Sequence, residues 1–283
     1  MQFTVTKSIA AQQKLSRSLI RKGKTIAVVP TMGFLHEGHL SLIKKALTKA
    51  DIVITTIFVN PTQFAPSEDF DRYPRDTKGD LRKIKSAGGH IVFMPKMQDM
   101  YPDGYETYVN VERLTQRLEG ASRPTHFKGV TTIVTKLFNI VQPDFALFGQ
   151  KDFQQATVLR KMTEDLNWPM KIIICPTVRE KDGLAMSSRN NYLTAELRPQ
   201  ATALYKALKE AQAMVKRGET KSSDVRKVMQ RIIRKTAPDA RIDYIAFNNL
   251  TTLQEMKTIA PQTVASLAVF LGPVRLIDNM KIA

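Results

Sequence analysis

The sequence predicts an α/β protein with a Rossmann-like, doubly wound parallel sheet and a smaller C-terminal α+β domain. First, residues 1–177 alternate short apolar runs with longer amphipathic segments. Second, these runs are nearly continuous in Val, Ile and Phe, which is typical of strands buried on both faces of a parallel sheet. Third, helices and strands separate after residue 177, as they do in α+β folds. We therefore expect one domain over 1–177 and another over 178–283.

The elements of the first domain are expected to alternate along the chain. Leu40, Ile43 and Leu47 recur three and four positions apart, so a helix is expected to begin near Gly38. Ligands of such sheets bind outside the carboxyl ends of the strands. The expected strands are 25–31, 51–60, 90–95, 144–150 and 171–177, and further helical patterns cover 76–89 and the positions around Ile133, Leu137 and Ile140.

The second domain is expected to place its helices before its strands. Helical patterns cover 193–219 and 222–237, and apolar strand patterns follow in 241–249 and 263–280. These strands can pair antiparallel, which predicts a small α+β domain.

The composition restricts the classes of protein to consider. Hydrophobic residues make up 43% of the 283 residues and charged residues 24%, as in globular domains. The one cysteine, Cys175, excludes an intramolecular disulfide and a cysteine-rich zinc site, and its apolar neighbours predict a buried strand residue. No apolar run approaches the ~20 residues of a membrane span, and no leader pattern is seen. We expect no membrane partner and a cytoplasmic location.

The net charge of +17 raises the possibility of a nucleic-acid-binding module. Clustered Lys and Arg neutralise the phosphates of nucleic acids. Here the excess is spread over both expected domains, with no polybasic tail and no ladder of aromatic residues. Such a module remains the alternative from a different class, but no nucleic-acid partner is expected and an anionic small molecule is favoured.

The segment "PTMGFLHEGH" carries the first candidate site. His36 and His39 lie three residues apart, where a strand ends and a helix begins near Gly38. The N-terminus of a helix binds anions, and two imidazoles there could donate to phosphate oxygens. A metal pair and a structural pair are the alternatives. The metal interpretation is weaker because zinc proteases space their histidines at i and i+4.

Polar residues also follow the second expected strand, in "FVNPTQF". Asn60 and Gln63 lie where side chains would face a ligand, and Gln suits a hydroxyl or a carboxylate. The alternative is a turn with capping amides. Asp80, at the head of the next helix, is interpreted as a carboxylate favoured by the helix dipole or as a contact to Mg²⁺.

The segment "FGQKDFQQ" follows the fourth expected strand. After Gly149, Lys151 can reach a phosphate, Asp152 can accept from ribose hydroxyls, and Gln155 lies one helical turn onward. Polar residues that open a helix directly after a buried strand favour binding over a plain loop.

The segment "MSSRN" places phosphate donors next to the expected domain boundary. Ser187, Ser188 and Arg189 could close over a triphosphate and hold the leaving pyrophosphate, or they could cap a helix ahead of Leu193. The chain has neither a G-x-x-x-x-G-K-[ST] phosphate loop nor a G-x-G-x-x-G fingerprint, which disfavours P-loop kinases and nicotinamide dehydrogenases.

Taken together, these segments resemble the pantoate–β-alanine ligase (pantothenate synthetase) family. The resemblance extends over the whole chain and also includes "RYPRD" and "RPTHFKGVTTIVTKLFNIVQPD". Within it, "HEGH" resembles the HIGH element of nucleotidylyltransferases and class I aminoacyl-tRNA synthetases, and "MSSRN" resembles their KMSKS-like loop. The alternative within this class is another adenylate-forming nucleotidylyltransferase acting on a different acid.

The resemblance implies an ATP-dependent, AMP-forming ligase that condenses pantoate with β-alanine through a pantoyl adenylate and releases pyrophosphate. It implies ATP as co-substrate, Mg²⁺, a homodimer, and only small molecules as substrates. The implied catalytic residues are His36, His39 and Lys151. The implied ATP contacts are Met32, Gly38, Gly149, Lys151, Asp152, Val178, Met186, Ser187, Ser188 and Arg189. Gln63 and Gln155 would bind pantoate, and Asn60, Tyr73, Arg123 and His126 match family positions whose roles are less defined.

The chain departs from the family pattern at the implied metal contact. The family commonly has two acidic residues near the head of the helix after "RYPR", whereas "TKGD" leaves only Asp80, after Gly79. Because the second acidic residue is missing, the Mg²⁺ contact through Asp80 is the role that the resemblance supports least.

Overall fold

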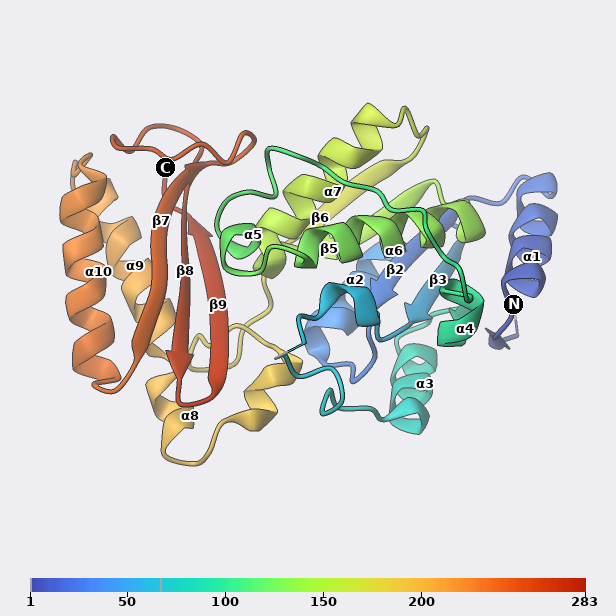
Figure 1. Ribbon diagram of the computed structural model, residues 1–283, viewed down its shortest axis with the longest axis horizontal. Coiled ribbons are helices and arrows are strands. Elements are labelled where there is room, and N and C mark those ends of the chain that lie inside the picture. The colour runs from blue at the N-terminus through green and yellow to red at the C-terminus, as the bar shows by residue number, and fades with distance from the viewer. Residues whose placement is uncertain (1, 67) are drawn as a thin grey trace. The chain divides into compact units, whose positions relative to one another are not determined.

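The computed structural model of the chain describes residues 2–66 and 68–283 (Figure 1). By contacts, the chain divides into two compact units. The first comprises the residues up to Gly149 together with Val158–Cys175, and the second comprises Gln150–Thr157 and Pro176–Ala283. The short segment that follows Gly149 thus groups with the C-terminal part of the chain.

The first unit contains a sheet of six parallel strands in the order β1-β4-β3-β2-β5-β6. The expected doubly wound α/β fold is confirmed. The order reverses between β2 and β5, so the switch point lies at the carboxyl ends of these strands, Thr31 and Gly149. The strands are β1 (Thr4–Thr6), β2 (Ile26–Thr31), β3 (Ile52–Ile57), β4 (Ile91–Phe93), β5 (Phe145–Gly149) and β6 (Lys171–Cys175).

The helices of the first unit pack apolar faces against this sheet. In α2, Ile43 and Ala46 are fully buried and belong to one apolar cluster with Val29 of β2 and Val53 of β3. Burying an isoleucine of this kind stabilises the fold by about 1.5–3 kcal/mol. The helices are α1 (Ile9–Arg21), α2 (Glu37–Leu47), α3 (Thr77–Ser86), α4 (Met97–Met100), α5 (Glu119–Ser122) and α6 (His126–Val141), with a 3₁₀ turn η1 (Pro61–Gln63). Helix α7 (Phe153–Asp165) begins in the second unit and ends in the first.

Some details differ from the expected elements. Strand β3 ends at Ile57 and not at residue 60, and the η1 turn begins at Pro61. The elements β1, α1, α4 and α5 were not predicted, and three of them are only three or four residues long. Cys175 ends β6 as a buried free thiol, as expected, and burial raises its pKa.

The second unit has the α+β architecture expected for the C-terminal part of the chain, but it also includes residues 150–157 and begins its main part at Pro176. Strands β7 (Arg241–Asn249), β8 (Thr263–Leu271) and β9 (Val274–Lys281) form an antiparallel sheet in that order. Its helices are α8 (Leu197–Gln200), α9 (Ala203–Lys216) and α10 (Ser222–Thr236), and its 3₁₀ turns are η2 (Gln150–Asp152) and η3 (Ser188–Tyr192). The run 263–280 contains two strands because the chain reverses at Gly272, whose φ is +55°.

The core of the second unit lies between its sheet and its helices. Leu208 of α9, Met229 and Ile233 of α10, and Phe247 of β7 are fully buried in one cluster with Leu267 of β8. Within residues 2–66 and 68–283, none of the helices combines the length and the apolar character that crossing a membrane requires.

Candidate active site

The turn after β2 is held by a buried carboxylate of α3. Gly33 and Phe34 have positive φ angles, 84° and 51°, which bring successive backbone N–H groups onto one side of the turn. Asp80, only 1% exposed, accepts the N–H of Phe34 at 2.8 Å and the N–H of Leu35 at 2.7 Å. Lys83 donates to the carbonyl of Leu35 at 2.7 Å. The turn that leads into α2 is therefore tied to α3.

His36 and His39 form a capping box at the start of α2. His36 is the N-cap residue, and its Nδ1 accepts the N–H of Gly38 at 3.1 Å. The Nδ1 of His39 accepts the N–H of His36 at 3.3 Å, and the ring centroids lie 4.2 Å apart. Because each Nδ1 accepts a hydrogen bond, each neutral ring carries its proton on Nε2. The spacing of three residues therefore caps the helix and also gives each ring an Nε2–H donor.

Gln63 is fixed through its side chain by residues from the turn after β2 and from the start of η1. Its Nε2 donates to the Sδ of Met32 at 2.8 Å, and its Oε1 accepts from the Nδ2 of Asn60 at 3.4 Å. Asn60 is 1% exposed and also donates to the carbonyl of Gly129, at 3.1 Å. Its Oδ1 accepts from the hydroxyl of Tyr101 at 2.8 Å. Burial raises the pKa of Tyr101 to about 12, so this hydroxyl remains a donor.

The main chain of Gln63 is held by two further predicted residues. Its carbonyl accepts from the Nδ1 of His126 at 2.8 Å and from Arg123 at 3.3 Å. Burial and the charge of Arg123 lower the pKa of His126 to about 4, so the ring is neutral at pH 7 and its Nδ1 carries the proton. Asn60, Arg123 and His126 thus converge on Gln63.

Arg123 is itself oriented by a carboxylate that the sequence analysis missed. Its Nε and Nη2 each lie 2.6 Å from an oxygen of Glu68, a bidentate pair. Burial alone would raise the pKa of Glu68, but the hydrogen bonds and charge of Arg123 hold it below its usual value. Tyr73 lies nearby in the chain but in an aromatic cluster: it is 6% exposed and packs edge-on against Phe64 at 5.9 Å.

The predicted residues after β5 lie on the η2 turn and the start of α7. A Cβ placed on Gly149 would meet no atom within 4 Å, so the strand ends beside open space. The Nζ of Lys151 lies 3.5 Å from the carboxylate of Asp152, which is exposed. Gln155 is half-buried on the first turn of α7.

The predicted phosphate donors of the second unit follow a small hairpin over residues 178–186. Met186 donates its N–H to the carbonyl of Val178 at 3.0 Å, so these two predicted residues face each other. Ser187 is the N-cap of η3, and its Oγ accepts the N–H of Arg189 at 3.3 Å. Ser188 is 7% exposed. The capping interpretation of Ser187 is thus realised, and its hydroxyl proton can still be donated.

Asp80 does not fit the role of a metal ligand. Both of its oxygens accept backbone N–H groups, and its burial leaves no open side for a hydrated ion. Elsewhere in the part of the chain that the structure describes, no group of three or more His, Cys, Asp or Glu could hold a metal ion. The carboxylate instead anchors the turn that precedes His36.

Three residues that shape these positions lie far along the chain from the residues that they bind. Glu68 lies 55 residues before Arg123, and Tyr101 lies 41 residues after Asn60. Asn279 lies 128 residues after Lys151, whose carbonyl it binds. Only Glu68 has a neighbouring clue, because it follows "NPTQFAP" in a segment already marked as a candidate.

The chain is similar to known ligases over nearly its whole length. The sequence profile described as Pantoate-beta-alanine ligase matches residues 4–281. The chain is 53% identical to a pantothenate synthetase of Moorella thermoacetica over 274 residues, 96% of each chain, and 52% identical to one of Acetivibrio thermocellus, covering 98% of each.

Solved structures agree with this similarity. A pantothenate synthetase from Thermus thermophilus superposes with a TM-score of 0.93 at 39% identity, covering 100% of this chain and 99% of the other. A pantoate-beta-alanine ligase from Francisella tularensis, complexed with Beta-gamma ATP and Beta-alanine, superposes with a TM-score of 0.83 at 35% identity, covering 99% and 97%.

Proposed function

The chain belongs to the pantoate-beta-alanine ligase family, and from this premise we propose that it joins pantoate to β-alanine through a pantoyl adenylate. In the first step the pantoate carboxylate attacks the α-phosphorus of ATP, and the bond from that phosphorus to the bridging oxygen breaks to release pyrophosphate. In the second step the β-alanine amine attacks the acyl carbon. The C–N bond forms, the C–O bond to AMP breaks, and the amine loses a proton.

The capping box of His36 and His39 carries this proposal. The N-terminus of α2, an 11-residue helix, presents backbone N–H groups and a positive dipole end to an anion. With both Nδ1 atoms accepting within the box, each ring carries its donor at Nε2. Two such donors can stabilise the charge that develops on the phosphate oxygens as pantoate attacks.

We assign pantoate binding to Gln63 and Gln155. The Met32 and Asn60 contacts hold the Gln63 amide, and the His126 and Arg123 contacts hold its main chain. A side chain fixed in this way can orient the pantoate carboxylate for attack without losing further freedom on binding. Asn60, Arg123 and His126 then act through Gln63, and Tyr73 supports the segment from within its aromatic cluster.

We assign ATP contacts to the remaining predicted residues. Gly149 would let the ribose approach the end of β5, and Asp152 would accept from its hydroxyls. The Lys151 ammonium is a compact charge suited to phosphate oxygens. The other proposed ATP contacts are Met32, Gly38, Val178, Met186, Ser187, Ser188 and Arg189.

We further propose that Mg²⁺ arrives with ATP, because phosphate oxygens are themselves its usual ligands. The geometry of Asp80 supports no direct contact to the ion. A homodimer in the cytoplasm is proposed on the family resemblance alone.

The proposal is tested by pyrophosphate release from ATP with pantoate present and β-alanine absent. We expect release that stops near one equivalent per enzyme, and then AMP and pantothenate when β-alanine is added. Release at the same rate with other hydroxy acids would overturn the pantoate assignment. AMP without pyrophosphate would overturn the adenylate step.

A further inference from the structure

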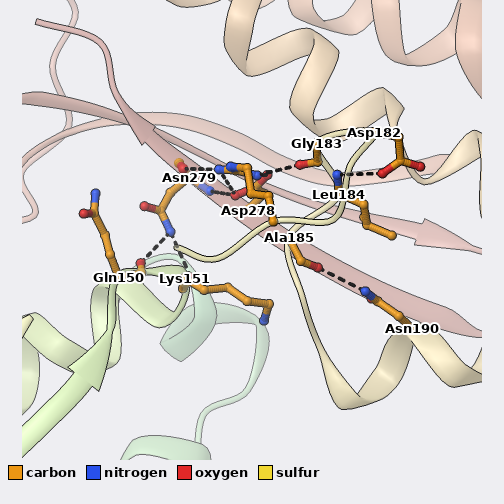
Figure 2. A network of polar contacts seen from close by, with 10 residues as sticks. Gln150, Lys151, Asp182, Gly183, Leu184, Ala185, Asn190, Asp278 and Asn279 are labelled. Carbon is orange, nitrogen blue, oxygen red and sulfur yellow. Dashed lines mark hydrogen bonds and ion pairs between the residues drawn. The ribbon is translucent and has the colours of Figure 1, made fainter. Parts of the chain in front are cut away.

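Asn279 of β9 holds the turn that carries Lys151. Its Nδ2 donates to the carbonyl of Gln150 at 2.9 Å and to the carbonyl of Lys151 at 2.8 Å (Figure 2). The side chain is buried, with 4% of the residue exposed. Both amide hydrogens are therefore used on consecutive carbonyls of η2, and these bonds fix the path of the main chain through Lys151.

The neighbouring residue of β9 holds the hairpin that leads to Ser187. Asp278, 3% exposed, pairs with Arg179 at 2.6 and 3.0 Å. Arg179 also donates to the carbonyl of Gly183 at 3.0 Å, across the hairpin. Figure 2 shows Gln150 and Lys151 of η2 near Asn279, and Gly183 and Leu184 of the hairpin near Asp278. Both segments with proposed phosphate contacts in the second unit are thus attached to two consecutive residues of one strand.

Asn279 is kept in an arrangement that is unfavourable for its own oxygen. Its Oδ1 is buried and has no hydrogen-bond partner in the structure, although a buried acceptor without a partner is destabilising. The contribution of the Asn279 side chain therefore comes from its Nδ2, which donates to the carbonyls of Gln150 and Lys151. β9 is one of the two edge strands of its sheet, and its contact to η2 is made by the Asn279 side chain.

We propose that Asn279 is a positioning residue for adenylate formation: by binding the carbonyls of Gln150 and Lys151, it sets where the Lys151 ammonium meets the phosphates of ATP. The inference rests on the proposed function, in which Lys151 contacts ATP. A displacement of about 1 Å in a positioned group costs about 10²-fold in rate. The second step, in which β-alanine attacks the acyl carbon, does not need contacts to the departed pyrophosphate.

The test is Asn279→Asp, which keeps the shape but replaces the donor by an oxygen facing two carbonyl oxygens. Asn279→Ser is the second variant, because it is small and keeps one donor. Asn248→Asp is the matched control: Asn248 lies on β7 of the same sheet, is 3% exposed, donates to the carbonyl of Leu253 at 2.8 Å and also has an unpartnered Oδ1. Its partner, Leu253, is not among the proposed ATP contacts.

Three quantities are measured for each variant: pantoate-dependent exchange of pyrophosphate into ATP, the KM for ATP, and the single-turnover rate of supplied pantoyl adenylate with β-alanine. For Asn279→Asp we expect the exchange rate to fall about 10²-fold and the KM for ATP to rise. The rate from supplied adenylate should stay within about twofold of the wild type, which also shows that the variant is folded. The exchange rate of Asn279→Ser should fall less than that of Asn279→Asp. The exchange rate of Asn248→Asp should equal that of the wild type.

Wild-type exchange in Asn279→Asp would overturn the inference. The inference would also be overturned if Asn279→Asp lowered the exchange rate and the rate from supplied adenylate equally, or if Asn248→Asp lowered the exchange rate as much as Asn279→Asp does. A purely structural role of Asn279 predicts these two results. If Asn279→Asp does not fold, the same criteria apply to Asn279→Ser. Absence of exchange in the wild-type protein would instead refute the proposed function, and the inference with it.

Discussion

The carboxylate of Asp80 accepts the main-chain N–H of Leu35 at 2.7 Å, although the two residues are 45 positions apart in the chain. Its other oxygen accepts the N–H of Phe34. This pair of bonds connects α3 to the turn that delivers His36 to the head of α2. The acidic residue that the sequence suggested as a metal contact is thus occupied in shaping the backbone.

Asp80→Asn should destabilise the protein and leave the Mg²⁺ requirement unchanged. The amide can accept only one of the two N–H groups and turns a donor toward the other, so we expect a loss of about 1–3 kcal/mol in the free energy of unfolding. Urea unfolding and the Mg²⁺ concentration at half-maximal rate are measured. Asp76→Asn is the control, because Asp76 caps α3 through the N–H of Gly79 and Asn caps equally well. Normal stability with a raised Mg²⁺ requirement would assign Asp80 to the metal.

Replacing His36 separates helix capping from phosphate binding. His36→Ala removes the acceptor for the Gly38 N–H and should cost about 1 kcal/mol of stability. His36→Asn restores a good cap but has no donor in the place of Nε2. Both variants should therefore lose about 10²–10³-fold in pyrophosphate exchange, while only the alanine variant loses stability. If His36→Asn exchanged pyrophosphate at the wild-type rate, His36 would cap the helix without binding phosphate.

The buried ring of His126 predicts a loss of stability in mild acid. In the folded protein its pKa is lowered to about 4, whereas the unfolded chain titrates near 6.5. Well above pH 6.5 the ring is neutral in both states and does not affect stability. As the pH falls from 6.5 towards 4, the unfolded state binds a proton and the folded state does not, which favours unfolding by about 2 kcal/mol at pH 5.

The measurement is the free energy of unfolding in urea between pH 7.5 and pH 4.5. His126→Gln is compared with the wild type, because its amide can still donate to the carbonyl of Gln63 and does not titrate. We expect the variant to lose less stability than the wild type over this range. Parallel curves for the two proteins would contradict the assigned pKa.

Gly129 permits the close approach of α6 to η1, and Gly129→Ala should weaken pantoate binding. A Cβ at this position would overlap the main chain of Thr62 and Gln63. Alanine favours a helix by about 1 kcal/mol over glycine, so any loss must come from this overlap. We expect the KM for pantoate to rise about tenfold or more and the KM for ATP to change little. Asn139→Ala, at an exposed position of the same helix, should leave both KM values unchanged.

The main strands and helices could be predicted from the sequence because each is marked by the spacing of apolar residues within a short segment. Continuous apolar runs marked β2, β5 and β6 within one or two residues of their ends, and the spacing of Leu40, Ile43 and Leu47 marked α2. The short elements β1, α4 and α5 were missed because three or four residues hold too little periodicity to be recognised.

By itself the sequence determined the family, the doubly wound sheet and the place of His36 and His39 at the head of a helix. A helix cap and a buried strand are both marked by residues that are neighbours in the sequence, so both can be recognised from the sequence alone. Only the tertiary structure decided that Asp80 binds the turn before His36, that His126 binds Gln63, and that Asn279 binds the turn of Lys151. A buried polar group must find its partner wherever packing brings one, and packing joins residues that are 45, 63 and 128 positions apart.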